Sequence, residues 1–200
     1  MVTKEKLDSL TTRAFDTACS HGFHDVERSN AHFMMLVLSE IGEMVEADRK
    51  NRHAIYDAME YCDKHVDEID VVSRNRYFER DVKDTLEDEL ADVVIRILDF
   101  CGKRGISLFM GNDGIVDMQD KFVEMFGEMS VCEQCFYLSS VVTSIGDDAP
   151  AQNLPSLVAC AISFCFEFAT FHKIDLLWHI EKKMAYNEPV QRCMERTINV

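Results

Sequence analysis

Residues that break helices are scarce in this chain. Its 200 residues include only three prolines and eight glycines, and the stretches between them carry apolar residues mainly at helical spacing. Alternating patterns typical of strands have little support. We therefore predict an all-α protein. The length and the 47% hydrophobic content suit a single domain over residues 1–200 with a core of its own.

Positive charge is also in short supply. Lysine and arginine number 21 against 36 aspartates and glutamates, which gives a formal net charge of −15, and no basic stripe is visible. Proteins that bind the phosphate backbone of nucleic acids carry such stripes, so we expect no nucleic-acid partner. An acidic protein can still bind a small polyanion through a bridging cation.

The chain has no run of eighteen apolar residues, and its N-terminus, MVTKEKLDSL, lacks a hydrophobic signal core. We therefore expect no membrane partner and a cytoplasmic protein. The eight cysteines are scattered, mostly inside apolar helical runs, where a reduced cysteine packs as a small hydrophobe. Cys132 and Cys135 have no second CxxC nearby, so packing is preferred to a zinc site.

Two carboxylates interrupt an apolar helix face near residue 40. A helix is expected over residues 30–50, where Glu40 and Glu43 lie about 60° apart on one face, with roughly 5–6 Å between their Cβ atoms. The neighbours of Glu40 on a helical wheel are apolar: Phe33, Leu36, Met44 and Ala47. Buried like charges destabilise a fold unless a cation lies between them, so this pair predicts a metal site.

The same spacing recurs in a second helix, expected over residues 84–102. Glu89 and Asp92 are three residues apart and share a polar stripe with Arg96 and Asp99. Such a stripe alone is more often solvent-exposed, but together the two pairs predict facing helices that each contribute carboxylates. Two other segments are expected to serve packing or to face solvent: a first helix over 3–20, and a helix plus a loop over the charged stretch 51–78.

The second half of the chain resembles the first at fixed shifts. Residues 138–143 align with 38–43 at a shift of 100, and residues 157–176 align with 89–108 at a shift of 68. This indicates a diverged tandem duplication, with a metal-binding half over 1–110 and a degenerate half over 115–200. Chance similarity between amphipathic helices is the alternative. The second copy carries other residues at the ligand positions: Ser140, Thr143, Leu157 and Cys160.

A third motif lies near the C-terminus. Lys183 and Asn187 are four residues apart on one helical face, where they can contact a phosphate or a base edge. The alternative is an exposed helix end, because Glu188 and Pro189 follow directly.

Taken in order, the three motifs resemble a known family. The residues 39–43 (SEIGE), 89–92 (ELAD) and 183–187 (KMAYN) are similar to the ExxE, ExxD and KxxYN signatures of the MazG-like, all-α nucleoside triphosphate pyrophosphohydrolases. Dimeric dUTPases and phosphoribosyl-ATP pyrophosphohydrolases are similar to that family. The chain departs from the pattern in the long separation of the acidic motifs, in the late position of the KxxYN segment, and in a displaced arginine, for which Arg192 is the nearest candidate.

The resemblance implies a helical bundle and Mg²⁺-dependent cleavage of a nucleoside triphosphate between its α- and β-phosphates. Mn²⁺ is an alternative ion. The implied metal ligands are Glu40, Glu43, Glu89 and Asp92. The implied substrate contacts are Lys183, Asn187 and Arg96. Glu43 or Glu46 is expected to act on the attacking water.

Two questions stay open from the sequence. The protein is expected to be either a monomeric pseudo-dimer or a homodimer, and the preferred base and sugar are not specified. The alternative function is that of a non-catalytic nucleotide-binding protein or a helical interaction module. A di-metal carboxylate protein is disfavoured, because neither acidic helix carries the Glu-x-x-His pattern of that class.

Overall fold

The computed structural model describes residues 2–108, 123–147 and 149–188, and this part of the chain is helical throughout, with no strands. The prediction of an all-α protein is thus confirmed for the described residues. Three helices begin and end within two residues of their predicted bounds: α1 (Lys4–Ser20), α2 (Asn30–Arg49) and α5 (Leu86–Arg104). Further along lie α6 (Val123–Phe126), α7 (Val131–Thr143), the 3₁₀ turn η1 (Ala151–Asn153), α8 (Leu154–His172) and α9 (Leu176–Asn187).

Short polar side chains set the starts of the two acidic helices. The Ser29 hydroxyl accepts a hydrogen bond from the backbone N–H of His32 before α2, and the Thr85 hydroxyl accepts one from Asp88 before α5. Both residues satisfy an otherwise unpaired N–H of the first turn. Helix α5 ends at Gly105, whose φ of 63° lies in the left-handed region that favours glycine.

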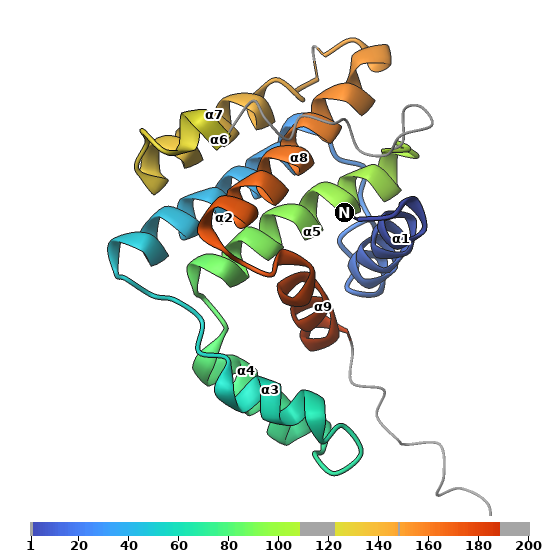
Figure 1. Ribbon diagram of the computed structural model, residues 1–200. Coiled ribbons are helices and arrows are strands. Elements are labelled where there is room, and N and C mark those ends of the chain that lie inside the picture. The colour runs from blue at the N-terminus through green and yellow to red at the C-terminus, as the bar shows by residue number, and fades with distance from the viewer. Residues whose placement is uncertain (1, 109–122, 148, 189–200) are drawn as a thin grey trace, which may run out of the picture.

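Helix α5 is the centre of the molecule and packs against α1, α2, α8 and α9 (Figure 1). Because neighbours surround it, its first turn is buried together with its apolar faces, including three consecutive acids, Glu87, Asp88 and Glu89. The core built around it includes Leu90, Val94, Ile97, Phe100, Met44 and Phe164. A helix surrounded in this way fixes the position of any polar group that it carries.

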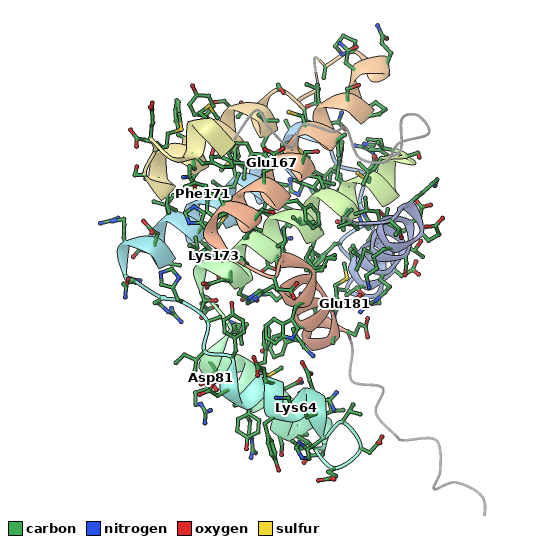
Figure 2. The ribbon with its side chains drawn as sticks, viewed as in Figure 1. Lys64, Asp81, Glu167, Phe171, Lys173 and Glu181 are labelled. Atoms are coloured by element: carbon green, nitrogen blue, oxygen red, sulfur yellow. The ribbon has the colours of Figure 1, made fainter. Side chains whose placement is uncertain are left out.

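The segment 51–78 differs from the prediction of one helix and a loop. It forms most of a helical hairpin, α3 (Asp57–Lys64) and α4 (Val71–Asp81), which extends beyond α9 at the lower end of Figure 1. Figure 2 shows Lys64 and Asp81 on this hairpin. Helix α4 was missed because it buries only Phe78 and Asp81, too few positions to give an apolar stripe.

The hairpin has a small core of its own, formed by Met59, Phe78 and Val82 and separate from the main core. Trp178 and Tyr186 of α9 pack against it. It therefore supports α9 rather than the centre of the bundle.

Helix α8 repeats α5 at the shift of 68 residues. The two helices span 86–104 and 154–172, and each ends in a left-handed residue, Gly105 or Lys173. The next N–H in each case bonds a carbonyl five residues back: Ile106 to Cys101 at 3.0 Å, and Ile174 to Ala169 at 2.8 Å. Helix α2 packs on α7 and α5 on α8. A tandem duplication would give α8 the length and the left-handed ending of α5, but the duplication itself stays a prediction.

By length and composition, the stretch Ala151–His172, which contains α8, is apolar enough to cross a membrane. The core helix of a soluble protein passes the same test, and 56% of the most apolar window is buried inside the molecule. The phenylalanines Phe164 and Phe168 on this helix are fully buried in the main core.

The seven cysteines in the described part of the chain are free thiols. Cys132 is exposed while Cys135 is buried, and burial raises the pKa of Cys135 to about 12. A buried thiol of that kind stays protonated and packs as an apolar group.

Candidate metal centre and its cleft

A cleft of about 720 Å³ lies between α1, α2, α5 and α9. Its volume is within the range of sites that bind small molecules. Residues from all three sequence motifs line it: Glu40, Glu43, Glu89, Asp92, Lys183 and Asn187. The chain thus brings together groups that are as far apart in sequence as residues 40 and 187.

Three carboxylates converge on the acidic wall of the cleft. Glu40, Glu89 and Asp92 each offer one oxygen, and these oxygens lie within 4.8 Å of one another. The exposed fractions of Glu40 and Glu89 are 7% and 3%. Glu43 lines the same cleft but is exposed and is not one of the three. Three oxygen donors at this spacing suit a hard divalent cation.

Two acids of the cluster, Glu89 and Asp92, are costly to ionise without a cation. Burial, with a further contribution from the carboxylate of Asp92, raises the pKa of Glu89 to about 8. Burial likewise raises the pKa of Asp92 to about 7, although Lys183 acts in the opposite direction. At neutral pH the cluster is therefore only partly ionised, and a bound cation would favour the fully ionised form.

Lys183 of α9 reaches the cluster from the second half of the chain. Its Nζ lies 2.6 Å from Oδ2 of both Asp88 and Asp92. Burial would lower the pKa of Lys183, but the two carboxylates outweigh it and raise the pKa. The KxxYN motif predicted a phosphate contact for this lysine, but here its Nζ contacts the acids of α5.

Asp88 was not singled out from the sequence. It is fully buried, its Oδ2 also accepts the backbone N–H of Asp84 at 3.0 Å, and within the described part of the chain its Oδ1 has no hydrogen-bond partner. The sequence does hold a signal for Asp88. It is one of three successive acids in a helix with apolar residues on several sides, and three successive side chains of such a helix cannot all face water.

Arg96 is the second cation of the site. Its Nε donates to Oε1 of Glu40 at 2.6 Å, and it also lines the cleft. The four carboxylates of Glu40, Asp88, Glu89 and Asp92 thus meet two cations, Lys183 and Arg96. If all are ionised, two negative charges are left over, which is the charge that one divalent cation balances.

Of the two residues predicted to act on water, Glu43 faces the cleft and Glu46 does not line it. Glu46 is exposed and ion-pairs with Lys50 at 2.9 Å and Arg49 at 3.3 Å. Its hydrogen bond to Lys50 lowers the pKa of Glu46. Arg192 lies outside the described residues.

Helix α9 is held from two sides. On one side Glu181 pairs with Lys6 and Arg13 of α1, and Figure 2 shows Glu181 on α9. On the other side the Tyr186 hydroxyl donates to Glu79 of the hairpin at 2.8 Å, and its ring stacks on Phe78 with centroids 4.9 Å apart. Lys183 is thereby held against Asp88 and Asp92, and Asn187 lies in the lining of the cleft.

A further pair lies at the α1 end of the cleft. Nε2 of His24 lies 2.6 Å from Oδ1 of Asp99, and Asp99 lines the cleft. From the sequence, Asp99 was expected in the polar stripe of the second acidic helix. Its pairing with His24 was not predicted, because it joins residues 75 positions apart.

Comparisons of this chain with protein-family models, with curated proteins and with solved structures found no match. The family resemblance therefore stays an expectation carried by the three motifs. The geometry of the cleft is therefore the basis for a proposed function.

Proposed function

We propose that the protein is a Mg²⁺-dependent nucleoside triphosphate pyrophosphohydrolase of the MazG-like, all-α type. It would cleave a ribo- or deoxyribonucleoside triphosphate between the α- and β-phosphates, giving a monophosphate and pyrophosphate. The observation that carries the proposal is that Glu40, Glu89 and Asp92 converge within 4.8 Å on the wall of a cleft that the KxxYN residues also line.

The residues of the acidic wall fit Mg²⁺. That ion prefers oxygen ligands in octahedral geometry and is held in proteins by one or a few carboxylates, substrate phosphates and waters. Glu40, Glu89 and Asp92 would supply the carboxylates, and Mn²⁺, which takes similar ligands, is expected to substitute. When bound, the cation would neutralise the phosphates and make an attacking water more acidic.

The remaining residues have tasks that follow from their positions. Glu43 is exposed in the cleft, where it can accept a proton from water. Asn187 can donate its amide N–H to a phosphate oxygen. Arg96 is about one-third exposed, so it can turn from Glu40 toward a phosphate. Lys183 presents its charge to the same region while it remains bound to Asp88 and Asp92.

A tandem duplication would explain why the KxxYN segment lies so late in the chain. A tandem duplication would let α7 and α8 cover α2 and α5 as a second subunit covers the first in a helical dimer. The site would then combine acids from the first half with Lys183 and Asn187 from the second. Ser140 and Thr143, at the positions that correspond to Glu40 and Glu43, donate to backbone carbonyls of their own helix.

The test is an assay of the full-length protein with Mg²⁺ and a panel of nucleoside triphosphates, in which pyrophosphate and monophosphate are both measured. We expect Glu40→Gln and Asp92→Asn to lose at least 100-fold in kcat/KM, because each removes a charged oxygen from the cluster. Glu60→Gln, on an exposed ion pair of α3 with Lys64, is the matched control and should retain full activity.

Thermal unfolding of each variant separates loss of chemistry from loss of fold. Folded variants that release no pyrophosphate support the proposal. Folded wild-type protein that turns over none of the triphosphates would instead favour a non-catalytic nucleotide-binding or interaction module.

A further inference from the structure

Resting on the proposed function, we infer that the α1 end of the cleft takes the base of the nucleotide and that Asp99 selects guanine. The bound molecule would lie along α5, with its phosphates at the acid cluster and its base at Asp99.

The spacing along α5 sets this arrangement. Asp92 and Asp99 both line the cleft and are seven residues apart, which is two helical turns or about 10 Å along the axis. That is about the span of an extended nucleoside. Phosphates bound through a cation beside Asp92 thus leave the base two turns further on, beside Asp99.

The walls of this end suit a flat, partly apolar group. Helix α1 contributes Ala14, Thr17 and Ala18, and the turn after it contributes His21 and Phe23. Phe23 lines the cleft and is 61% exposed. Its ring offers a face on which a base can stack, a contact that does not depend on which base is bound.

One carboxylate oxygen of Asp99 is hydrogen-bonded to His24, and among the described residues the other is not hydrogen-bonded. Its Oδ1 is held by His24, which packs between Phe15 and Phe33 with centroid distances of 5.0 and 5.8 Å. Within the described part of the chain, the hydrogen bond of Asp99 is made by Oδ1, and Oδ2 has no hydrogen-bond partner. Burial raises the pKa of Asp99, while the hydrogen bond with His24 acts in the opposite direction. In its ionised form the carboxylate only accepts, and that form calls for a base edge that only donates.

Guanine has that edge. Its ring N1–H and its 2-amino group are adjacent donors, which Oδ2 and the second lone pair of Oδ1 can accept together. Adenine and cytosine place a ring-nitrogen acceptor beside their amino group, while uracil and thymine flank their N–H with carbonyl oxygens. Each of these would bring an acceptor lone pair against the oxygen of Asp99, so guanine is favoured.

The experiment compares GTP with ITP, which differs only by lacking the 2-amino group, on the full-length protein with Mg²⁺. ITP loses one hydrogen bond to a charged group, which is worth a discrimination of roughly 10- to 150-fold, so we expect kcat/KM for GTP to exceed that for ITP by about 10-fold or more. Asp99→Asn should bring the ratio near one and improve the use of xanthosine triphosphate, whose 2-oxo group accepts from an amide. Asp16→Asn, an exposed position of α1 outside the cleft lining, should leave the ratio unchanged.

Equal use of GTP and ITP by the wild-type protein would overturn the inference even if both are cleaved, in which case the proposed function stands. If no triphosphate is cleaved, the proposed function fails separately, and calorimetric binding of GMP against IMP tests recognition by itself. Tighter binding of GMP supports the role of Asp99, and equal binding overturns it. Both comparisons use the wild-type chain, so they remain decisive if Asp99→Asn does not fold.

Discussion

Glu89 combines deep burial with close carboxylate neighbours, and this makes the metal-free protein sensitive to pH. Its pKa is about 8 in the folded protein against an ordinary value of 4.5. The folded state therefore binds more protons than the unfolded state between these values, and the free energy of unfolding falls as pH rises from about 4.5 to 8. We expect the melting temperature in EDTA to fall over that range, and Mg²⁺ to restore much of the loss at pH 8.

Glu89→Gln is the variant that isolates this effect. It removes the charge at nearly constant volume, so it should stabilise the metal-free protein at pH 8 by about 2 kcal/mol, or roughly 4–8 °C in Tm. The same variant should lose the stabilisation by Mg²⁺. Unfolding in EDTA at several pH values measures both. A variant that melts as the wild type does at pH 8 would show that Glu89 is not held in a charged cluster.

Lys183 and its neighbour Lys182 form a natural comparison on α9. Lys183 is buried against Asp88 and Asp92, whereas the pair between Lys182 and Asp63 is partly exposed. Lys183→Met leaves two buried carboxylates without their cation and should cost about 3–5 kcal/mol, while Lys182→Met should cost about 1 kcal/mol or less. Urea unfolding of both variants decides this. Equal losses would mean that the buried pair does not hold α9 on α5.

At the scale of single elements, the hairpin α3–α4 depends on a core separate from that of the bundle. Phe78 is 2% exposed and stacks on Tyr186. We expect Phe78→Ala to cost the hairpin about 3–5 kcal/mol and to speed amide exchange in residues 57–81, while α5 keeps its protection. Val72→Ala, 58% exposed on the same helix, is the control. Faster exchange throughout α5 would contradict a separate core.

How far the sequence predicted each element depended on whether its residues form a regular stripe. Helices α1, α2 and α5 were predicted from apolar spacing, whereas the capping roles of Ser29 and Thr85 were found only in the structure. The convergence of Glu40 with Glu89 and Asp92 was predicted from the apolar neighbours of Glu40 and from the same three-residue spacing at Glu89 and Asp92. Helix α4 and the pairing of His24 with Asp99 could not be predicted, because the first has almost no apolar face and the second depends on tertiary packing.

At the scale of the whole molecule, the acidic site depends on both halves of the chain. The carboxylates belong to α2 and α5, but the cation that offsets Asp88 and Asp92 is Lys183 of α9. Helices α7 and α8 also cover α2 and α5. A fragment of residues 1–110 would expose this apolar surface and lack the lysine.

We therefore expect residues 1–110 alone to release no pyrophosphate from any triphosphate, while the full chain does. Co-expression with residues 115–200 should restore activity, because the division near Gly114 lies between the helices that form the site, and the two parts can pair through α2 with α7 and α5 with α8. Pyrophosphate release, together with sedimentation of the fragment alone and of the pair, measures both expectations. An active fragment of residues 1–110 would show that the acids of the first half need nothing from α9, and the site would then not be composite.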